Sequence, residues 1–521
     1  MNRRAFLKAA GAAVTYFSLP VCISKSIANS EKPPNLLFIM TDQQRFDALS
    51  YAGNKILNTP NMDRLAREGA WFKNTHTQCA VCGPARAAML TGHSVANNKA
   101  ISNKTAYLPE EAGIMPMKTY DEILAENGYE CEYYGKWHSP VFRAKCYNNP
   151  VTMAGIHKTE VGPGHKEAYI QYLNPLYPDR ELKEGEFKDT LTDRPYRPYP
   201  LDKRFDFKKK GEDSNIKVGQ SDIHGVTQIP AKYHMPAFEA GEALHALEQL
   251  KDKPFSITCS FHHPHPPYLA TEEYIKMYPA EKMVPPVSIS DDMADSPYIN
   301  MKKNTRKDYS DPKKIQYFIA EYYALVKEVD DQVGQLLGKL DEYGLTDNTM
   351  VVFVSDHGEM LGDHGMKGKF CFYEASSHVP MMIRFPGRIN PGTKVNSPVS
   401  NMDLFATILD YLNIPGHPSD GNSLRGLIEG TVDKDTYVVT EWLSDLQGKP
   451  SHMVLKDGWK LIRPDDSAKK VKMGLYNLNN DPHELKNLLA NKAGSKKYAA
   501  KVAELEACFQ NWMERTSENK Q

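Results

Sequence analysis

Beyond its first 30 residues, the 521-residue sequence has no apolar run of the roughly 20 residues that a membrane-spanning helix needs. Internal repeats, low-complexity tracts and long basic blocks are also missing. Because 64 Lys and Arg residues nearly balance 65 Asp and Glu residues, nucleic acid is not expected as a main partner. With 41% hydrophobic and 25% charged residues, the composition excludes a disordered or fibrous chain.

Cysteine is scarce as well, with 8 residues in the whole chain, too few for a disulfide framework. Cys79 and Cys82 have Cys-x-x-Cys spacing, but no second such pair or Cys/His cluster completes a zinc site. Seven cysteines follow the first 30 residues, and this odd number leaves at least one of them free for chemistry.

Residues 1–30 are expected to form a twin-arginine signal peptide. Arg3 and Arg4 precede a moderately apolar stretch, and Ala28 and Ser30 offer the small residues that a signal peptidase prefers. The stretch is interrupted by polar residues and a proline, which disfavours a membrane anchor. The sequence therefore predicts export through the twin-arginine machinery and a periplasmic or secreted protein.

Short apolar runs alternate with helical patterns along the first three-quarters of the chain. This order predicts an α/β fold with a mostly parallel central sheet flanked by helices. The strands are expected at 36–40, 129–134, 255–261, 350–354 and 381–385, and the longest helix at 316–342.

The pattern changes after about residue 386. Strands are expected at 437–442, 453–455, 460–463 and 475–478, with hairpin residues between them and a helix at 496–514. These features predict a catalytic domain at 31–390, with an irregular insertion at 140–235. A smaller α+β subdomain with an antiparallel sheet is expected at 391–521.

Polar side chains follow the ends of the predicted strands. Asp42 comes after the first strand, Asp356 and His357 after the fourth, and Lys136 and His265 after two others. Since the carboxyl ends of parallel strands meet at one crevice, these segments are expected to form one site. Asp42, Asp356 and His357 offer two hard oxygens and an imidazole, which suits a divalent cation.

The segment 82–92 is the most specific in the chain. Pro84 favours a helix start, and the following Ala-Ala-Met-Leu favours its continuation. Cys82 is thereby expected near a helix N-terminus, where backbone N–H groups favour an anion and lower the pKa of a thiol. Cys82 is either a thiolate nucleophile or the precursor of another reactive group.

Cys82 to Arg86, followed by Thr-Gly, resembles the signature of the type I sulfatases of the alkaline phosphatase-like superfamily. The resemblance extends to the segments at 36–42, 135–138, 263–266 and 355–369 and weakly to 475–482, so it spans about residues 35–490. In that family the cysteine is oxidised to Cα-formylglycine. Its hydrate attacks sulfur, and loss of a proton from its second hydroxyl then expels sulfate.

The resemblance implies a role for each matching residue. The metal ligands would be Asp42, Asp356, His357 and converted Cys82. Around the reacting group, Arg86 would hold the nucleophile, Lys136, His265 and Lys369 the sulfate oxygens, and His138 the proton of the diol. His265 or Lys369 would protonate the leaving alcohol, and Asn103 matches a position that contacts substrate in some relatives.

Two positions depart from the commonest family pattern. Many sulfatases have Asp-Asp where this chain has Asp42-Gln43, and Asp-Asn where it has Asp356-His357. The combination resembles choline sulfatases, several carbohydrate sulfatases and the phosphonate monoester hydrolases. Gln43 is therefore expected beside the ligands rather than among them. Calcium is the first candidate for the cation, with magnesium and manganese as alternatives.

The main prediction is a sulfatase acting on a sulfated glycan or small molecule, with a formylglycine-generating enzyme and the twin-arginine machinery as partners. A phosphonate monoester or phosphodiester hydrolase is the alternative, since both esters carry tetrahedral oxyanions. A silent glycan-binding relative and a thiol-based Cys-His hydrolase are two further hypotheses. The first leaves the convertible cysteine without a purpose, and the second leaves the metal-ligand set unexplained.

Overall fold

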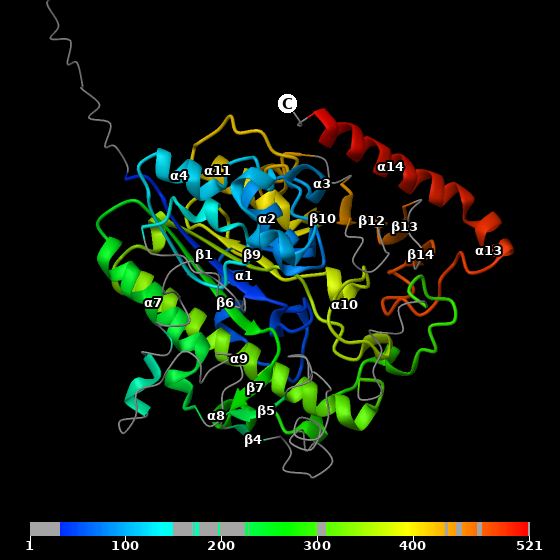
Figure 1. Ribbon diagram of the computed structural model, residues 1–521, viewed down its shortest axis with the longest axis horizontal. Coiled ribbons are helices and arrows are strands. Elements are labelled where there is room, and N and C mark those ends of the chain that lie inside the picture. Colours follow the sequence, from blue (N-terminus) through cyan, green and yellow to red (C-terminus); the bar gives the residue numbers. More distant parts are fainter. Residues whose placement is uncertain are drawn as a thin grey trace, which may run out of the picture. The chain divides into compact units, whose positions relative to one another are not determined.

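The computed structural model describes residues 32–148, 229–299, 309–432, 436–443, 451–465 and 471–518, with short pieces at 169, 172–176, 196–197 and 224–227 (Figure 1). The signal peptide predicted at 1–30 and most of the insertion predicted at 140–235 lie outside the described residues. Residues Pro34–Gln521 form one compact unit.

A seven-stranded sheet in the order β10-β2-β9-β8-β1-β6-β3 forms the centre. Only β9 runs antiparallel to its neighbours, so the predicted mostly parallel sheet is confirmed. The strands are β1 (Asn35–Asp42), β2 (Ala70–His76), β3 (Glu130–Gly135), β6 (Phe255–Pro264), β8 (Thr349–Ser355), β9 (Met381–Arg384) and β10 (Thr393–Ser400).

Helices cover both faces of this sheet because strand β1 is apolar on both sides. Leu37 and Ile39 belong to the cluster under one layer of helices, while Leu36 and Phe38 belong to the cluster under the other. Figure 1 shows the two layers on opposite sides of the strands. The first contains α1 (Pro60–Glu68), α7 (Met235–Leu250) and α9 (Pro312–Glu342), and the second α2 (Cys82–Thr91), α4 (Tyr120–Glu126) and α11 (Leu404–Tyr411).

Helix α9 begins four residues before its predicted start. Asp311 caps it by accepting hydrogen bonds from the backbone N–H groups of Lys313 and Lys314, and Pro312 occupies the first turn. The side-chain oxygen and the fixed φ of proline both favour a helix start. No helix of the described residues is both long enough and apolar enough to span a bilayer.

The second, four-stranded sheet is antiparallel, as predicted, and has the order β11-β12-β13-β14. Asp457 and Gly458 form its tight turn with φ angles of 51° and 76°, which favour a two-residue hairpin. Helix α14 (Ala499–Glu518) packs against this sheet through Phe509 and Trp512. The strands are β11 (Val438–Trp442), β12 (Ser451–Lys456), β13 (Trp459–Pro464) and β14 (Gly474–Asn477).

Two strands of the central sheet were not expected. In β2, the less buried Lys73 and Asn74 interrupt the apolar pattern, and β10 contains Pro398, which an edge strand tolerates. The described residues also contain a small sheet of β4 (Tyr196–Arg197), β5 (His224–Thr227) and β7 (Tyr268–Thr271). Shorter helices are α3 (Val95–Asn98), α8 (Glu272–Ile275), α10 (Glu374–Ser377), α12 (Arg425–Glu429) and α13 (Lys492–Lys497).

Candidate active site

The predicted convergence of the strand ends is present. Asp42 is the last residue of β1, which lies between β8 and β6, and Asp356 follows β8 directly. The backbone N–H of Asp356 donates to the carbonyl of Thr41, which fixes the two strand ends side by side. Lys136 follows β3, the neighbour of β6.

Cys82 is the first residue of helix α2, whose ten residues are all buried. Its Sγ lies 2.9 Å from Lys369 Nζ, 3.7 Å from Lys136 Nζ and 3.1 Å from His357 Nε2. Burial and the nearby Asp42 raise the pKa of the thiol, but the two ammonium groups and His357 outweigh them, so this pKa falls well below its usual value. Cys82 is therefore the candidate for the reactive group of the site.

Cys79, which precedes helix α2, behaves differently. Burial raises its pKa well above the usual value, and its side chain packs in an apolar cluster with Val81 and Val95. Both cysteines are free. The Cys-x-x-Cys spacing is thus neither a disulfide nor a zinc half-site in this structure.

The four predicted metal ligands lie together. The ligand atoms of Asp42, Cys82, Asp356 and His357 are all within 4.8 Å of one another, and all four residues are buried. His357 Nδ1 donates to the carbonyl of Gly358 at 2.8 Å, so the lone pair of a neutral ring is on Nε2, the atom facing Cys82. This donor set fits a divalent cation.

Arg86 holds the two carboxylates in place. Its Nη2 lies 3.1 Å from Asp42 Oδ2 and its Nε 2.9 Å from Asp356 Oδ2, with no side chain of the three exposed. Its Nη1 donates to Ser260 Oγ at 2.8 Å and to the carbonyl of Lys136. Because Arg86 occupies the Oδ2 atoms, the Oδ1 atom of Asp42 is left to face Cys82 at 3.8 Å.

The two carboxylates differ in their electrostatics. Burial raises the pKa of Asp42, but Lys136, at 2.6 Å from Oδ2, and then His265, Lys369 and Arg86 bring it well below its usual value. For Asp356, burial and the charge of Asp42 raise the pKa above its usual value. A divalent cation between them would favour the ionised form of both groups.

Lys369 and His265 face the same centre. Burial lowers the pKa of Lys369, but the thiolate of Cys82 and the two aspartates raise it above its usual value, which keeps the ammonium charged. Partial burial, followed by the charges of Lys136 and Lys369, lowers the pKa of His265 well below its usual value. His265 Nδ1 donates to the carbonyl of Pro266 at 2.6 Å, so the neutral ring has no proton on Nε2.

His138 and Asn103 border Cys82. His138 adopts a left-handed φ of 51° and hydrogen-bonds to Cys82, while burial lowers its pKa and leaves Nδ1 without a hydrogen-bond partner. Asn103 Oδ1 accepts a hydrogen bond from the backbone N–H of Gly83 at 2.9 Å. A Cβ at Gly83 would lie only 3.1 Å from that oxygen, which explains the need for glycine. Asn103 thus supports the start of helix α2.

Comparison with known proteins decides the family. A model of the sulfatase family matches residues 34–414, and a model described as N-sulphoglucosamine sulphohydrolase, C-terminal, matches residues 362–511. The chain belongs to the sulfatase family. This sulfatase is a sulfuric ester hydrolase, and its family implies a divalent metal and a formylglycine.

The chain resembles both a sulfatase in sequence and a phosphonate monoester hydrolase in fold. It is 27% identical to the multifunctional alkaline phosphatase superfamily protein PehA of Trinickia caryophylli, over 92% of this chain and 95% of that protein. It is 28% identical to the N-acetylglucosamine-6-O-sulfatase of Bacteroides thetaiotaomicron, over 92% and 87%. The fold resembles a phosphonate monoester hydrolase of Agrobacterium radiobacter, with a TM-score of 0.70, 24% identity and coverage of 91% and 95%.

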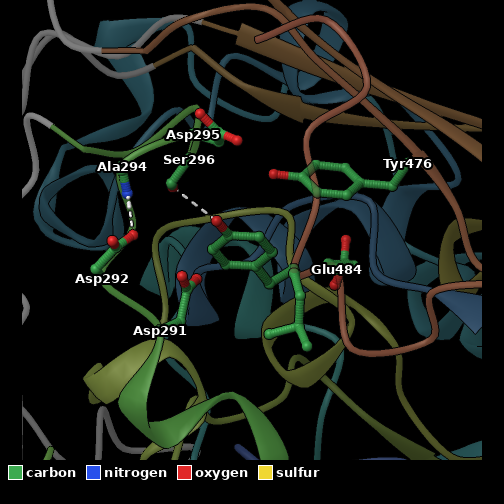
Figure 2. Close-up of a pocket in the computed structure, with 9 residues that line it drawn as sticks. Asp291, Asp292, Ala294, Asp295, Ser296, Tyr476 and Glu484 are labelled. Atoms are coloured by element: carbon green, nitrogen blue, oxygen red, sulfur yellow. Dashed lines mark hydrogen bonds between the residues drawn. The ribbon is translucent and has the colours of Figure 1, made fainter.

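A separate pocket of about 180 Å³ on the sulfatase is unsuited to its substrate. Figure 2 shows Asp291, Asp292 and Asp295 along one wall and Tyr476 and Glu484 on the other. Acidic groups repel an anionic ester, whereas the residues around Cys82 attract one. None of the predicted catalytic residues lines this pocket.

Two residues of the site were missed from the sequence. Ser260 lies within β6 and accepts from Arg86, and Glu359 hydrogen-bonds to Gln43. Glu359 follows the predicted ligand pair by only two residues, so its place in the motif was a usable signal. Ser260 gave no signal, because a serine in a buried strand is common without any role.

Proposed function

We propose that this sulfatase hydrolyses the sulfate ester of a carbohydrate, or of an aryl or alkyl alcohol, through formylglycine made from Cys82. The observation that carries the proposal is the balance of buried charge. Once Cys82 is converted to an uncharged residue, the cations of Arg86, Lys136 and Lys369 face only two carboxylates. The surplus of positive charge favours a sulfate ester anion.

Formylglycine, once hydrated, would supply a geminal diol whose hydroxyl attacks sulfur and whose collapse releases sulfate. A cation held by Asp42, Asp356 and His357 would lower the pKa of that hydroxyl and draw charge from the sulfate oxygens. Calcium is the proposed ion, with magnesium and manganese to be tested beside it, because an imidazole ligand weakens the preference for calcium.

The chain's own side chains would orient the ester and move its protons. Lys136 and Lys369 are placed to neutralise charge on the sulfate oxygens, and His138, beside Cys82, to take a proton from the diol. The sequence left the choice between His265 and Lys369 as proton donor open. We assign it to Lys369, because His265 uses its Nδ1 proton on Pro266.

Burial of Cys82 bears on maturation. Its side chain is 1% exposed, so an enzyme that oxidises its Cβ would need the unfolded chain. Twin-arginine export carries folded proteins, so we propose that conversion precedes export to the periplasm or medium. The export machinery and this location are proposed from the sequence of residues 1–30, which lie outside the described residues, and the maturation enzyme from the motif at Cys82.

The second candidate function is hydrolysis of a phosphonate monoester or phosphodiester. Similarity of fold to the phosphonate monoester hydrolase supports it, and the Asp42-Gln43 pattern is compatible with it. Lys136 and His138 favour sulfate, because the resembling phosphonate hydrolases have neutral residues there.

The test combines mass spectrometry and turnover. Peptide analysis across Cys82, in protein from a host with a maturation enzyme, is expected to find the aldehyde. The same preparation is expected to release sulfate from an aryl sulfate faster than phosphonate from the matched aryl phosphonate. A preference for the phosphonate would establish the second candidate, and active protein with only an unmodified thiol would refute the mechanism.

A further inference from the structure

Gln43 links two charged groups that do not touch each other. Its Oε1 accepts a hydrogen bond from Lys369 Nζ at 2.7 Å, and its Nε2 donates to Glu359 Oε2. Gln43 is 2% exposed and Glu359 1%, so water does not compete for these bonds. Gln43 also has a left-handed φ of 72°, which its buried contacts must hold against strain.

Glu359 is surrounded by donors. Its Oε1 accepts from the backbone N–H of Leu361 at 3.1 Å and of Gly368 at 2.5 Å, and the hydroxyl of Tyr268 also hydrogen-bonds to it. An ionised carboxylate only accepts, and every one of these neighbours can donate. Gly368 immediately precedes Lys369, so Glu359 touches the backbone that carries this lysine.

We propose that Glu359 is a positioning residue that acts through Gln43 to hold the Lys369 ammonium at the reacting group on Cys82. It would do so from two sides, through Gly368 N–H on the backbone and through the Gln43 amide on Nζ. The proposal rests on the function proposed above, in which Lys369 faces the sulfate ester and its leaving oxygen.

The chemistry of the amide explains why a glutamine stands here. Glu359 can only accept, so it selects the NH₂ end of Gln43, and the oxygen is then turned toward an ammonium that can only donate. Without the carboxylate the amide can flip, and its NH₂ would face Lys369. The bond to Lys369 uses one of the two lone pairs of the amide oxygen.

A reciprocal exchange tests this arrangement in the full-length, formylglycine-containing enzyme. Glu359→Gln removes the group that orients the amide, and Gln43→Glu places two carboxyl groups against each other. Each is expected to lower kcat by roughly 10- to 100-fold, with a KM change below about 3-fold. In the double variant, Gln43→Glu with Glu359→Gln, the new carboxylate at position 43 accepts from Lys369, and the new amide at position 359 donates to that carboxylate. We expect kcat to return to within about 5-fold of the parent enzyme.

Glu321→Gln is the matched control, since it also neutralises a fully buried glutamate, one that pairs with His224 at 2.9 Å. It is expected to leave kcat unchanged. Two results would show that the role of Glu359 is merely structural, and either overturns the proposal. One is a kcat of the double variant no higher than that of the slower single variant. The other is a kcat of Glu359→Gln equal to that of Glu321→Gln. Calorimetric titration with Ca²⁺ or Mn²⁺ is expected to give the same cation affinity for Glu359→Gln and the parent. A loss of affinity of about 10-fold or more would overturn the proposal, because Glu359 would then support the cation site.

The exchange of residues 43 and 359 can also be tested by a measurement of stability that does not depend on kcat. The denaturation midpoints of the four proteins are expected to show the same recovery in the double variant. If the parent enzyme releases no sulfate from any ester, the proposed function fails, while recovery of the midpoints still reports on the link between Glu359 and Gln43. If the parent is active and neither kcat nor the midpoint recovers, only the positioning role fails.

Discussion

Two clusters in this sulfatase contain similar side chains and do different things. Asp42, Cys82, Asp356 and His357 form the candidate cation site, and His76, Glu374 and His378 form a second group close enough to share an ion. In the first, a lone pair of His357 faces the centre. In the second, His76 and His378 both donate to the carboxylate of Glu374, which also binds an ammonium. The direction in which the histidine protons point, rather than the residue types, distinguishes the two clusters.

The ammonium in the second cluster belongs to Lys460 on β13. Its Nζ lies 2.6 Å from Glu374 Oε1, 2.8 Å from Glu484 Oε1 and 2.8 Å from the carbonyl of Phe372, so its three protons are all used. Glu374 also contacts His76 at 3.0 Å and His378 at 2.9 Å. This cluster fastens the antiparallel sheet to α10 and β2, which is a structural role.

The largest expected difference between the clusters is in turnover. Cys82→Ala removes the nucleophile and is expected to lower kcat by at least about 10⁴-fold without unfolding the protein. His378→Gln, at the edge of the second cluster, is expected to leave kcat per folded molecule within about 2-fold. Sulfate release, normalised to the folded fraction from circular dichroism, measures both. Activity surviving in Cys82→Ala would move the chemistry away from the first cluster.

The second largest expected difference between the clusters is in cation binding. Removing the metal with a chelator is expected to abolish turnover reversibly, and His357→Ala to weaken cation affinity by at least about 10-fold because it removes a ligand. His76→Gln is expected to change neither affinity nor stoichiometry. Calorimetry on the chelated protein should therefore find one ion per chain. A second ion, lost in His76→Gln, would contradict the structural role of the second cluster.

The two buried lysines provide a matched pair. Lys369→Met is expected to lower kcat by about 10²- to 10³-fold, because Lys369 faces the reacting group. Lys460→Met is expected to lower the free energy of unfolding by roughly 3–5 kcal/mol, because it removes the ammonium from the buried carboxylate of Glu484 and from the partly buried one of Glu374, with little change in kcat. Urea unfolding and kcat measured on both variants should separate the effects. If Lys460→Met lowered kcat without changing the free energy of unfolding, the structural role assigned to Lys460 would be wrong.

The sequence was sufficient to predict five of the seven strands of the central sheet and the residues that gather at their ends. Buried parallel strands are continuous apolar runs, and their polar ends, such as Asp42 and Asp356, share one edge of the sheet. The antiparallel sheet was equally visible, since Asp457-Gly458 is a strong hairpin signal. Strand β2 was missed because Lys73 and Asn74 face outward next to an edge strand, where polarity is tolerated.

Pairings between distant side chains could not be predicted. Lys460 and Glu374 lie far apart in the sequence and meet only because the second sheet packs against α10. The link from Glu359 through Gln43 to Lys369 depends on the direction in which one amide points. Residue type and spacing indicated which groups gather at the strand ends, whereas tertiary packing decides which atom faces which.

The smallest expected effect concerns the pH dependence of stability. Burial raises the pKa of Glu374, but Lys460, His76 and His378 bring it well below the usual value. A carboxyl group whose pKa is lower in the folded than in the unfolded state stabilises above its unfolded pKa of about 4.3, and loses this contribution as pH falls through the folded value. Glu374→Gln should therefore lower the free energy of unfolding by about 3 kcal/mol at pH 7, and by less below about pH 4.

Urea unfolding of the parent and of Glu374→Gln, from pH 7 down to about pH 3.5, measures this convergence. Glu504→Gln is the control, because its pair with Lys501 is within reach of solvent, with side chains 40% and 27% exposed, and it is expected to change stability by less than about 0.5 kcal/mol at every pH. If the difference in the free energy of unfolding between the parent and Glu374→Gln stayed constant with pH, packing rather than charge would hold the second cluster together. The ammonium of Lys460 would then not be the group that holds Glu374 in place.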